Sequence, residues 1–569
     1  MKDMDMFGDK NRPAFGIDLG TTNSCISVLK SGKIPTIIPV NEEKVTLPSC
    51  VMWKGGDKFI VGQEAYDLKF KANVASSVKR IIGTDEKVTL EYGGKKLVLT
   101  PEEVSAKVLK ELADKASEKY GKVQDVVITV PAYFNNNQIE ATIRAGKLAG
   151  LNVLKTFREP TSAALTYVLD DIKKPEVTVL VYDLGGGTFD ISLLKITKAQ
   201  DTSEIDAIYG FEKTDETSGA LSLSVLKTDG NSRLGGDDID NELYKILAHK
   251  LREQGFDPNY IPVEEAKSLK HRLEYAKKNA NAVVSLSLDF KMNDKEGTRV
   301  KTSVYITPED SFNATKKIYD QTKICMDRAL NGINLDQIDC ILLVGGSTKS
   351  QVIKTLLAKD YPSVFISDAL NPDESVALGA GIEAKRIKFG MSDMKVYDVI
   401  PLGIGVLADD RIVKIIPKNQ MVPYTATRNF GTTIDDQEQI GLHFYQGNSS
   451  IREECTYIGS LVIKDIPKGK AGSVKVKVAM TINADGVLKC RATIGNIDRS
   501  IELTNLFTGK EDNPSPLTDI DMKKYNRWKR LVNRIDNPKK QSEFKQLLEN
   551  FKNHKADEKV IVEFIKVNC

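Results

Sequence analysis

The order of hydrophobic and polar residues divides this chain into two stretches with different patterns. Before about residue 390, short apolar runs such as 126–130 alternate with longer segments in which apolar residues recur every three or four positions. The short runs are typical of buried strands, and the longer segments are typical of helices that pack on a sheet. Because strands and helices alternate, the pattern predicts an α/β fold for this stretch.

Local end signals define some of these elements. Thr100 followed by Pro101 and Glu103 is a capping box with proline at the first helical position, so a helix is expected to begin at residue 101. Residues 14–62 are interpreted as short strands, and the polar segment 198–218 as a surface hairpin or insertion. Strands are expected at 126–130, 153–157, 177–183, 188–196, 282–290, 301–306 and 339–344. Helices are expected at 101–119, after Pro131 up to about 149, at 159–169, 236–254 and 264–280, from 308, and at 348–359 and 374–388.

A pattern of period two begins after about residue 400. Val476, Val478 and Met480 alternate with polar or small residues, as in a strand with one wet face, and Asp485 with Gly486 supplies a hairpin turn. An antiparallel β module is therefore expected. The predicted divisions of the chain are a flexible N-terminus at 1–13, an α/β domain at 14–389, a linker at 390–400, the β module at 401–508 and a short helical tail at 517–569.

Composition narrows the class of protein. The chain has 569 residues, too many for one core, and its net charge of +3 is too small to indicate nucleic acid or a membrane surface as the partner. No apolar run reaches membrane-spanning length, and the N-terminal residues lack the apolar core of a signal peptide. The seven cysteines form no Cys-x-x-Cys pair, which favours reduced thiols and a cytoplasmic location. With four histidines, a histidine-based metal site or catalytic triad is not expected.

Three apolar runs end at glycine turns that are followed by a hydroxyl side chain. They are Ile-Asp-Leu-Gly-Thr-Thr at 17–22, Tyr-Asp-Leu-Gly-Gly-Gly-Thr at 182–188 and Val-Gly-Gly-Ser-Thr at 344–348. Glycine lets backbone N–H groups converge on a phosphate, while Asp18 and Asp183 could hold a hydrated Mg²⁺. A single copy would be interpreted as a hairpin turn. Two near-copies and a related third turn instead indicate a duplicated phosphate-binding site in a nucleotide-handling protein.

Six motifs in one order carry a resemblance to a known family. They are Ile-Asp-Leu-Gly-Thr-Thr-Asn-Ser, Val-Pro-Ala-Tyr-Phe-Asn, Arg-Glu-Pro-Thr-Ser-Ala-Ala, Asp-Leu-Gly-Gly-Gly-Thr-Phe-Asp, Leu-Gly-Gly-Asp-Asp and Val-Gly-Gly-Ser-Thr. From about residue 14 to 508 the chain resembles the seventy-kilodalton heat-shock chaperones, within the actin-like ATPase superfamily. The resemblance implies a multidomain protein: a two-lobed actin-like ATPase domain, then an antiparallel β-sandwich that binds peptides, then a short α-helical lid.

The resemblance also implies roles for individual residues. Lys79 would place its ammonium at the γ-phosphate and the attacking water, Glu159 and Asp190 would orient water and metal, and Thr188 would approach the γ-phosphate. Together with Asp183, these are the expected catalytic residues. Asp18 and Asp183 would hold Mg²⁺ through waters and help to bind K⁺. The residues expected to bind ATP or ADP are Gly20, Thr21, Thr22, Asn23, Gly185, Gly186, Gly187, Thr188, Gly235, Gly236, Glu274, Lys277, Lys278, Gly345, Gly346, Ser347, Lys349 and Asp373.

The implied function is that of an ATP-dependent molecular chaperone. ATP binding and hydrolysis would control its affinity for extended hydrophobic peptide segments of unfolded proteins, held in part by Phe430 and Ile440. The same two residues could also be plain core residues, because periodicity does not separate the two interpretations. Pro131, Asp393 and Asp398 would take part in interdomain coupling. A J-domain co-chaperone and a nucleotide-exchange factor are the expected protein partners.

Several positions differ from the usual family pattern. Lys349 replaces an arginine that commonly stacks on adenine, and Lys155 and Arg158 replace residues that usually help to dock the J-domain. Ile139 stands where relatives usually carry an arginine, and the linker reads Met-Lys-Val-Tyr at 394–397 in place of a run of leucines. About fifty residues follow the β module, so a short lid and faster peptide exchange are expected.

Other function classes share part of this pattern. A non-refolding chaperone relative, acting as an ATP-binding regulator or nucleotide-exchange factor, would fit the altered linker and short lid. An actin-like filament protein or a sugar kinase would share the duplicated Asp-Gly turn, but neither explains the linker and the β module. ATPase activity that rises with an extended apolar peptide would distinguish a chaperone from these alternatives.

Overall fold

The computed structural model divides the chain into two compact units, residues 1–401 and 402–569, and each is described here by itself. The described residues are 13–30, 34–69, 72–169, 174–198, 221–278, 285–294, 297–389, 394–482, 488–503, 528, 540, 541, 544, 545, 547, 548 and 561. The predicted N-terminal segment up to residue 12, the loop at 199–218, Asp393, the turn at 485–486 and nearly all of the predicted lid therefore lie outside the described residues.

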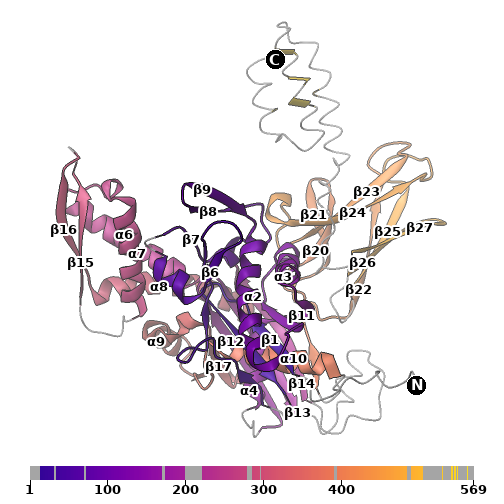
Figure 1. The fold of residues 1–569 in the computed structure, drawn as a ribbon. Coiled ribbons are helices and arrows are strands. Elements are labelled where there is room, and N and C mark those ends of the chain that lie inside the picture. The colour runs from indigo at the N-terminus through magenta and orange to yellow at the C-terminus, as the bar shows by residue number, and fades with distance from the viewer. Residues whose placement is uncertain are drawn as a thin grey trace. The chain divides into compact units, whose positions relative to one another are not determined.

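Among the sheets of the first unit, the two main ones share the same strand connectivity (Figure 1). The first sheet runs in the order β11-β10-β1-β2-β3, and β4 also pairs with β2. Its strands are β1 (Ala14–Asp18), β2 (Asn23–Leu29), β3 (Thr36–Ile37), β4 (Leu47–Pro48), β10 (Asp125–Val130) and β11 (Asn152–Arg158). β1 and β2 form an antiparallel hairpin, and β10 and β11 extend the sheet in parallel from β1.

The second sheet repeats this arrangement in the order β18-β17-β12-β13-β14-β19. Its strands are β12 (Glu176–Leu184), β13 (Phe189–Lys198), β14 (Leu221–Asn231), β17 (Cys340–Val344), β18 (Phe365–Ser367) and β19 (Met394–Tyr397). The β12–β13 hairpin corresponds to β1–β2, and the parallel strands β17 and β18 correspond to β10 and β11. This repeat places the two similar Asp-Leu-Gly turns at equivalent strand ends.

Helices cover these sheets and also separate them. α4 (Glu159–Leu169) and α10 (Ser375–Phe389) pack on each other, with α10 against β1 and α4 against β12 and β13. α2 (Pro101–Tyr120) and α3 (Asn136–Leu148) pack on the first sheet, and α8 (Pro308–Leu330) and α9 (Gln351–Asp360) on the second. The remaining longer helices are α6 (Gly236–Glu253) and α7 (Val263–Lys278). No helix in the described ranges combines the length and the apolar character needed to cross a membrane.

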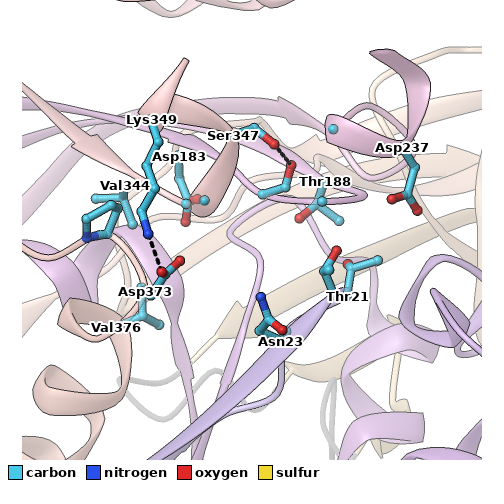
Figure 2. A pocket seen from close by; sticks show the side chains of 18 of the residues that line it. Thr21, Asn23, Asp183, Thr188, Asp237, Val344, Ser347, Lys349, Asp373 and Val376 are labelled. Carbon is cyan, nitrogen blue, oxygen red and sulfur yellow. Dashed lines mark hydrogen bonds and ion pairs between the residues drawn. The ribbon is translucent and has the colours of Figure 1, made fainter. Parts of the chain in front are cut away.

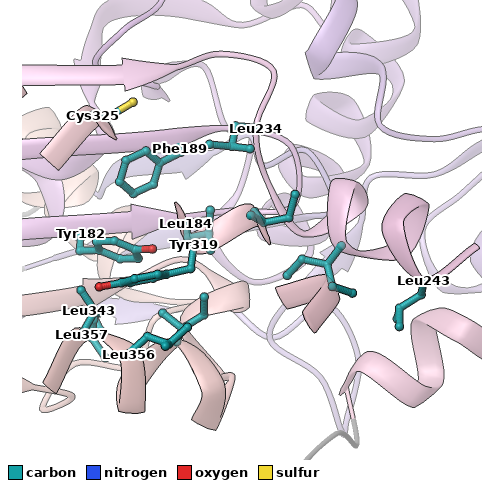
Figure 3. Packing of buried hydrophobic residues seen from close by; sticks show 14 of the residues in the cluster. Tyr182, Leu184, Phe189, Leu234, Leu243, Tyr319, Cys325, Leu343, Leu356 and Leu357 are labelled. Atoms are coloured by element: carbon teal, nitrogen blue, oxygen red, sulfur yellow. The ribbon is translucent and has the colours of Figure 1, made fainter. Parts of the chain in front are cut away.

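The largest apolar core lies beneath the second sheet (Figure 3). Tyr182 and Phe189, on the two strands of the β12–β13 hairpin, meet edge to face with ring centroids 4.9 Å apart. The buried Tyr182 hydroxyl lies 2.8 Å from the hydroxyl of Thr322 on α8, so its polar end is satisfied within the core. This packing holds the strand ends that carry Asp183 and Asp190 in fixed positions.

Smaller elements surround the two main sheets of the first unit. The strands are β5 (Val51–Trp53), β6 (Phe59–Val61), β7 (Val74–Ala75), β8 (Val88–Tyr92), β9 (Lys95–Leu99), β15 (Leu286–Asn293) and β16 (Arg299–Ile306). The helices are α1 (Gln63–Leu68) and the 3₁₀ turns η1 (Val78–Ile81), η2 (Pro258–Tyr260), η3 (Leu335–Gln337) and η4 (Gly346–Lys349).

The described part of the second unit contains two four-stranded antiparallel sheets, the short 3₁₀ turn η5 (Arg452–Glu454) and single helical positions at 528, 540, 541, 544, 545, 547, 548 and 561. The first sheet, in the order β21-β20-β23-β24, contains β20 (Ile404–Ala408), β21 (Arg411–Ile416), β23 (Gln439–Gln446) and β24 (Thr456–Lys464). The second, in the order β22-β25-β26-β27, contains β22 (Tyr424–Gly431), β25 (Lys475–Ile482), β26 (Leu488–Ile494) and β27 (Ile497–Leu503). Val476, Val478 and Met480 are buried, as their alternation predicts.

The α/β character of the first stretch and the antiparallel strands of the second are confirmed, but some expected elements were wrong or missing. The sequence prediction omitted β14, although Leu221, Leu223 and Val225 alternate with serines, because the preceding polar loop masked the start of this pattern. The helix expected at 348–359 begins at Gln351, since 346–349 form a 3₁₀ turn around the third glycine turn. The predicted linker contains β19, which pairs in parallel with β14.

Close packing of α10 on α4 generates a first prediction. A Cβ added to Gly379 on α10 would lie 1.9 Å from the carbonyl oxygen of Ser162 on α4. We expect Gly379→Ala to lower the free energy of unfolding by about 2–3 kcal/mol, because two backbones must separate. Thermal unfolding of the full chain, followed by circular dichroism, measures the change.

Ser375→Ala, on the same helix, is the matched control. The Ser375 hydroxyl is buried and has no hydrogen-bond partner among the described residues, so its removal should cost no stability. A Gly379→Ala chain that unfolds at the wild-type temperature would contradict the close α4–α10 contact.

Candidate functional site

The glycine turns of the two main sheets of the first unit face one cavity of about 400 Å³ (Figure 2). The β1–β2 turn supplies Asp18 and residues 20–23, and the β12–β13 turn supplies Asp183 and Thr188. The segment after β17 closes a further side. Residues more than three hundred positions apart in the chain therefore line a single space.

The first turn is shaped by close backbone contacts. A Cβ on Gly20 would lie 1.9 Å from the carbonyl oxygen of Asn23, so no larger residue fits this turn. The Gly20 N–H donates to the hydroxyl of Ser24 at 3.2 Å, and Ser49 lies 2.9 Å from the same hydroxyl. The side chain of Thr21 is nearly buried at the cavity wall.

The second turn touches the first one directly. A Cβ on Gly186 would lie 1.9 Å from the hydroxyl oxygen of Thr22. On its other side, a Cβ on Gly235 would lie 2.5 Å from the backbone nitrogen of Gly187. Gly187 and Gly235 therefore allow the second turn to pack on the start of α6, and they stand behind the cavity wall.

A buried ion pair lies at the inner end of the cavity. The ammonium of Lys79, on η1, donates to Glu159 Oε1, at the first position of α4, with 2.6 Å between the two atoms. Both side chains are buried, and the Lys79 ammonium also lies 5.7 Å from the centre of the Phe134 ring. These residues are 80 positions apart in the chain. Because both side chains are buried, removing either one would leave the other charge unpaired and lower the stability of the fold.

Several buried acidic side chains gather at the cavity, and burial shifts their pKa values upward. Burial raises the pKa of Glu159 to about 8, with further contributions from Asp18 and Asp190, although Lys79 opposes the shift. Burial raises the pKa of Asp190 to about 7 and the pKa of Asp183 well above its usual value. Burial alone would lower the pKa of Lys79, but the carboxylates of Glu159 and Asp18 raise it, so this side chain is held as an ammonium. A single cation faces several buried acids.

The arrangement of these acids fits a hydrated divalent cation. Asp18 Oδ1 accepts from the hydroxyl of Thr129 at 2.8 Å, and Asp190 Oδ1 accepts from the backbone N–H of Tyr133 at 2.9 Å. Asp190 Oδ2 is buried and has no hydrogen-bond partner within the described part of the chain. No group of three His, Cys, Asp or Glu side chains there could hold a metal directly. Mg²⁺ prefers oxygen ligands and keeps several waters, so Asp18 and Asp183 suit it.

Polar side chains at the outer end of the cavity pair with one another. The ammonium of Lys349 bonds to the carboxylate of Asp373 (Figure 2). Lys277 donates to the carbonyl oxygen of Gly236 at 2.9 Å and to Asp240 at 2.7 Å.

Glu274 lies at this end as well. It accepts from the hydroxyl of Tyr66 at 3.1 Å, and Lys69 lies 3.5 Å from its other oxygen. The last two contacts join α1 to α7 across the mouth of the cavity.

Most of the residues selected from the sequence line this cavity. They are Asp18, Gly20, Thr21, Thr22, Asn23, Lys79, Glu159, Asp183, Gly185, Gly186, Thr188, Gly236, Glu274, Lys277, Gly345, Gly346, Ser347, Lys349 and Asp373. Gly187, Gly235 and Asp190 stand behind the wall, and the side chain of Lys278 lies outside the described part. The sequence analysis missed the lining residues Asp237, Ile239, Val344, Ser350, Pro372 and Val376. Asp237 could have been found, because it belongs to the Leu-Gly-Gly-Asp-Asp motif.

The expected peptide-binding and coupling residues lie elsewhere. In the second unit, Phe430 on β22 pairs with Val476, and the buried Ile440 on β23 pairs with Ile463. These two side chains therefore belong to different sheets. In the first unit, Pro131 is buried directly after β10.

Asp398, in the first unit, follows β19 and accepts from Arg158 Nε at 2.7 Å. Arg158 also donates to the backbone carbonyl of Ala132. Arg158 stands immediately before Glu159, so two neighbouring residues serve two sites. Glu159 pairs with Lys79 in the cavity, and Arg158 binds Asp398 in the segment that follows β19.

Comparison with known proteins connects this geometry to one family. A family model described as Hsp70 protein matches residues 14–564. The chaperone protein DnaK of Mycoplasmoides gallisepticum is 34% identical over 521 residues, covering 89% of this chain and 80% of that protein. The chaperone protein DnaK of Mycoplasma mobile is 34% identical over 517 residues, covering 90% of this chain and 80% of that protein. The resemblance inferred from the motifs is confirmed.

The contact between the two glycine turns generates a second prediction. Gly186→Ala should weaken the binding of Mg·ATP about tenfold or more, because the new methyl group must displace Thr22 from the cavity wall. Isothermal titration calorimetry with Mg·ATP measures the change. Lys110→Ala, at an exposed position of α2 outside the cavity lining, is the control and should leave the affinity unchanged. Equal affinities for the two variants would contradict this account of the turns.

Proposed function

Because this chain belongs to the Hsp70 family, we propose that the cavity of its first unit holds ATP between the two glycine turns. The chain is an ATP-dependent chaperone and an ATPase, as members of that family are. The observation that supports this placement is the convergence of both turns, the Lys79–Glu159 pair and two aspartates on one cavity. The alternative of a non-refolding regulator is not favoured by these comparisons.

The proposed contacts divide between phosphates and metal. Backbone N–H groups of the two turns and the hydroxyls of Thr21 and Thr22 bind phosphate oxygens. Asp18 and Asp183 hold Mg²⁺ through waters. When bound, Mg²⁺ would offset the charge of the triphosphate and of the surrounding carboxylates. Binding of K⁺ by the same aspartates stays a prediction.

The proposed hydrolysis needs positioning and charge more than covalent chemistry. Phosphoryl transfer proceeds when a water is held in line with the terminal phosphorus and the developing charge is offset. Lys79 supplies the positive charge, and Glu159 and Asp190 would orient the attacking water and the Mg²⁺ ion. Thr188 donates its hydroxyl to the terminal phosphate. The cavity wall around these buried groups limits access of other water.

The outer end of the cavity is the proposed adenosine side, lined by Glu274, Lys277, Lys349 and other residues. Lys349 does not present the flat guanidinium with which an arginine stacks on a base. Its ammonium is instead held by Asp373. We therefore infer that base recognition depends mainly on the walls formed by residues such as Ile239 and Val376.

The second unit is the proposed peptide-binding domain. Extended apolar segments would bind by main-chain hydrogen bonds and by contacts near Phe430 and Ile440. The family relationship supports this role. The burial of Ile440 does not distinguish a peptide-binding residue from a core residue. A J-domain co-chaperone, a nucleotide-exchange factor and a cytoplasmic location stay predictions, as do the domain boundaries and the short lid.

Communication between hydrolysis and peptide binding is proposed to pass through β19. This strand adds to the edge of the second sheet, and Asp398 directly after it is held by Arg158. A movement of β19 would change this ion pair and hence the backbone at Glu159. Asp398, Pro131 and Asp393 are thus proposed coupling residues, of which Asp393 lies outside the described part.

The Lys79–Glu159 pair generates a third prediction. Lys79→Ala should lower the single-turnover rate of ATP hydrolysis about 10²–10³-fold, because one preorganised positive charge is lost. Lys110→Ala, which removes an exposed lysine of α2, is the control and should leave the rate unchanged. Rates measured with and without an extended apolar peptide also test the chaperone function. Hydrolysis at the wild-type rate in Lys79→Ala would refute the assigned role.

The Arg158–Asp398 pair generates a fourth prediction. Arg158→Gln and Asp398→Asn should each reduce the stimulation of hydrolysis by an apolar peptide about fivefold, and the double variant should lose no more than either single one. This non-additive result is expected because both substitutions break the same contact. Additive losses in the double-mutant cycle would show that the two residues act independently.

A further inference from the structure

A lysine and a cysteine of the second unit lie in contact although they are 41 positions apart. Lys414 is on β21, the edge strand of its sheet, and Cys455 stands between η5 and β24. The Lys414 ammonium donates to Cys455 Sγ, with 3.6 Å between nitrogen and sulfur. The thiol in turn donates to the backbone carbonyl of Ser449 at 3.2 Å.

Two glycines make room for this pair. A Cβ on Gly403 would lie 3.4 Å from Lys414 Cδ, and a Cβ on Gly447 would lie 2.6 Å from Cys455 Sγ. The N–H of Gly447 donates to the carbonyl oxygen of Gly403 at 2.9 Å, so the two bare backbone positions are adjacent. The Lys414 side chain packs on Gly403, and the Cys455 thiol packs on Gly447. The absence of side chains at these two glycines therefore allows the lysine and the cysteine to come into contact.

The environment of the pair differs from that of the other described thiols. Cys25, Cys50, Cys325, Cys340 and Cys490 are buried, whereas Cys455 is half-buried. Within the described part of the chain, no carboxylate pairs with Lys414, whose ammonium faces the sulfur instead. Partial burial lowers the pKa of Lys414, which increases the share of the neutral, nucleophilic amine.

We propose that Cys455 and Lys414 form a reversible sulfur–nitrogen crosslink when the chaperone meets hydrogen peroxide. In the first step, sulfur attacks one peroxide oxygen, the O–O bond breaks, and sulfenic acid and one water result. In the second step, the neutral amine of Lys414 attacks the sulfur, the S–O bond breaks, and the hydroxyl leaves as water with an amine proton. Sulfur is oxidised by two electrons and peroxide is reduced to two waters. Excess thiol returns both side chains to their starting state.

The crosslink would join β21 to the chain segment that precedes β24. β21 pairs with β20 on one side, and its isolated bridge from Arg411 to Ile451 is the other backbone link to that segment in the described residues. A covalent bond at Lys414 would therefore add a second connection between this sheet edge and the segment that precedes β24. The inference does not depend on the ATP site or on the peptide site.

The test is peptide mapping of the full chain after treatment with hydrogen peroxide. A Cys569→Ser background is used, because that thiol lies outside the described residues. Trypsin digestion should release a joined species that contains Lys414 and Cys455, with the summed mass of its two peptides less two hydrogens. Dithiothreitol should separate it. Lys418→Arg, on the segment after β21, is the matched control and should leave the yield of the joined species unchanged, with its mass shifted only by the substitution.

Two variants, combined with a reagent that captures sulfenic acid, show whether the crosslink forms between Lys414 and Cys455. Lys414→Arg keeps the positive charge but should abolish the joined species and increase labelling of Cys455 by dimedone, which captures sulfenic acid. Cys455→Ser should abolish both signals. The proposal is overturned if Cys455 of the wild-type chain is oxidised without joining Lys414, if the joined mass retains one peroxide oxygen, or if Lys414→Arg still forms the species.

Discussion

The first unit is organised around a cluster of buried acidic side chains that outnumber the cations facing them among the described residues. Asp18, Glu159, Asp183 and Asp190 surround the single ammonium of Lys79, and burial raises the pKa of each of these acids. Such a cluster costs folding free energy, since charges are removed from water with incomplete pairing. The same cluster is suited to a bound cation and to hydrolysis, in which charge must be offset at fixed points.

Repetition of one sheet topology explains why the charge gathers at one place. Each sheet contains an antiparallel hairpin whose two strands are joined by an Asp-Leu-Gly turn. Helices α4 and α10 pack between the two sheets. Glycine at the contact points allows backbones to meet where any side chain would clash, as for Gly186 beside Thr22. Glycine is needed here mainly because the two turns lie so close together, and less because either turn must be flexible.

One strand end links this cavity to the edge of the second sheet. Arg158 and Glu159 follow each other where β11 becomes α4, so their side chains leave the backbone in different directions. Glu159 meets Lys79, and Arg158 meets Asp398. These two neighbouring residues therefore connect the segment after β19 with the cavity.

The sequence by itself determined the features that arise from local order: the alternation of strands and helices, the period-two strands of the second unit, the capping box at Thr100 and the glycine turns. Each depends on residues a few positions apart, whose propensities and spacing are visible in one dimension. The family resemblance carried by the motifs also identified most cavity residues, including Lys79 and Glu274, which stand outside the glycine turns. Ile239 and Val376 were missed because an apolar residue on a helix has no mark that distinguishes a cavity wall from a core.

Only the tertiary structure decided which distant side chains meet. Lys79 and Glu159, Arg158 and Asp398, and Lys414 and Cys455 are separated by 80, 240 and 41 positions. β14 depends for its place on β13 and β19, one on each side. Contacts of this kind follow from how whole sheets and helices pack, since packing is fixed by the summed burial of many residues and by close backbone approach.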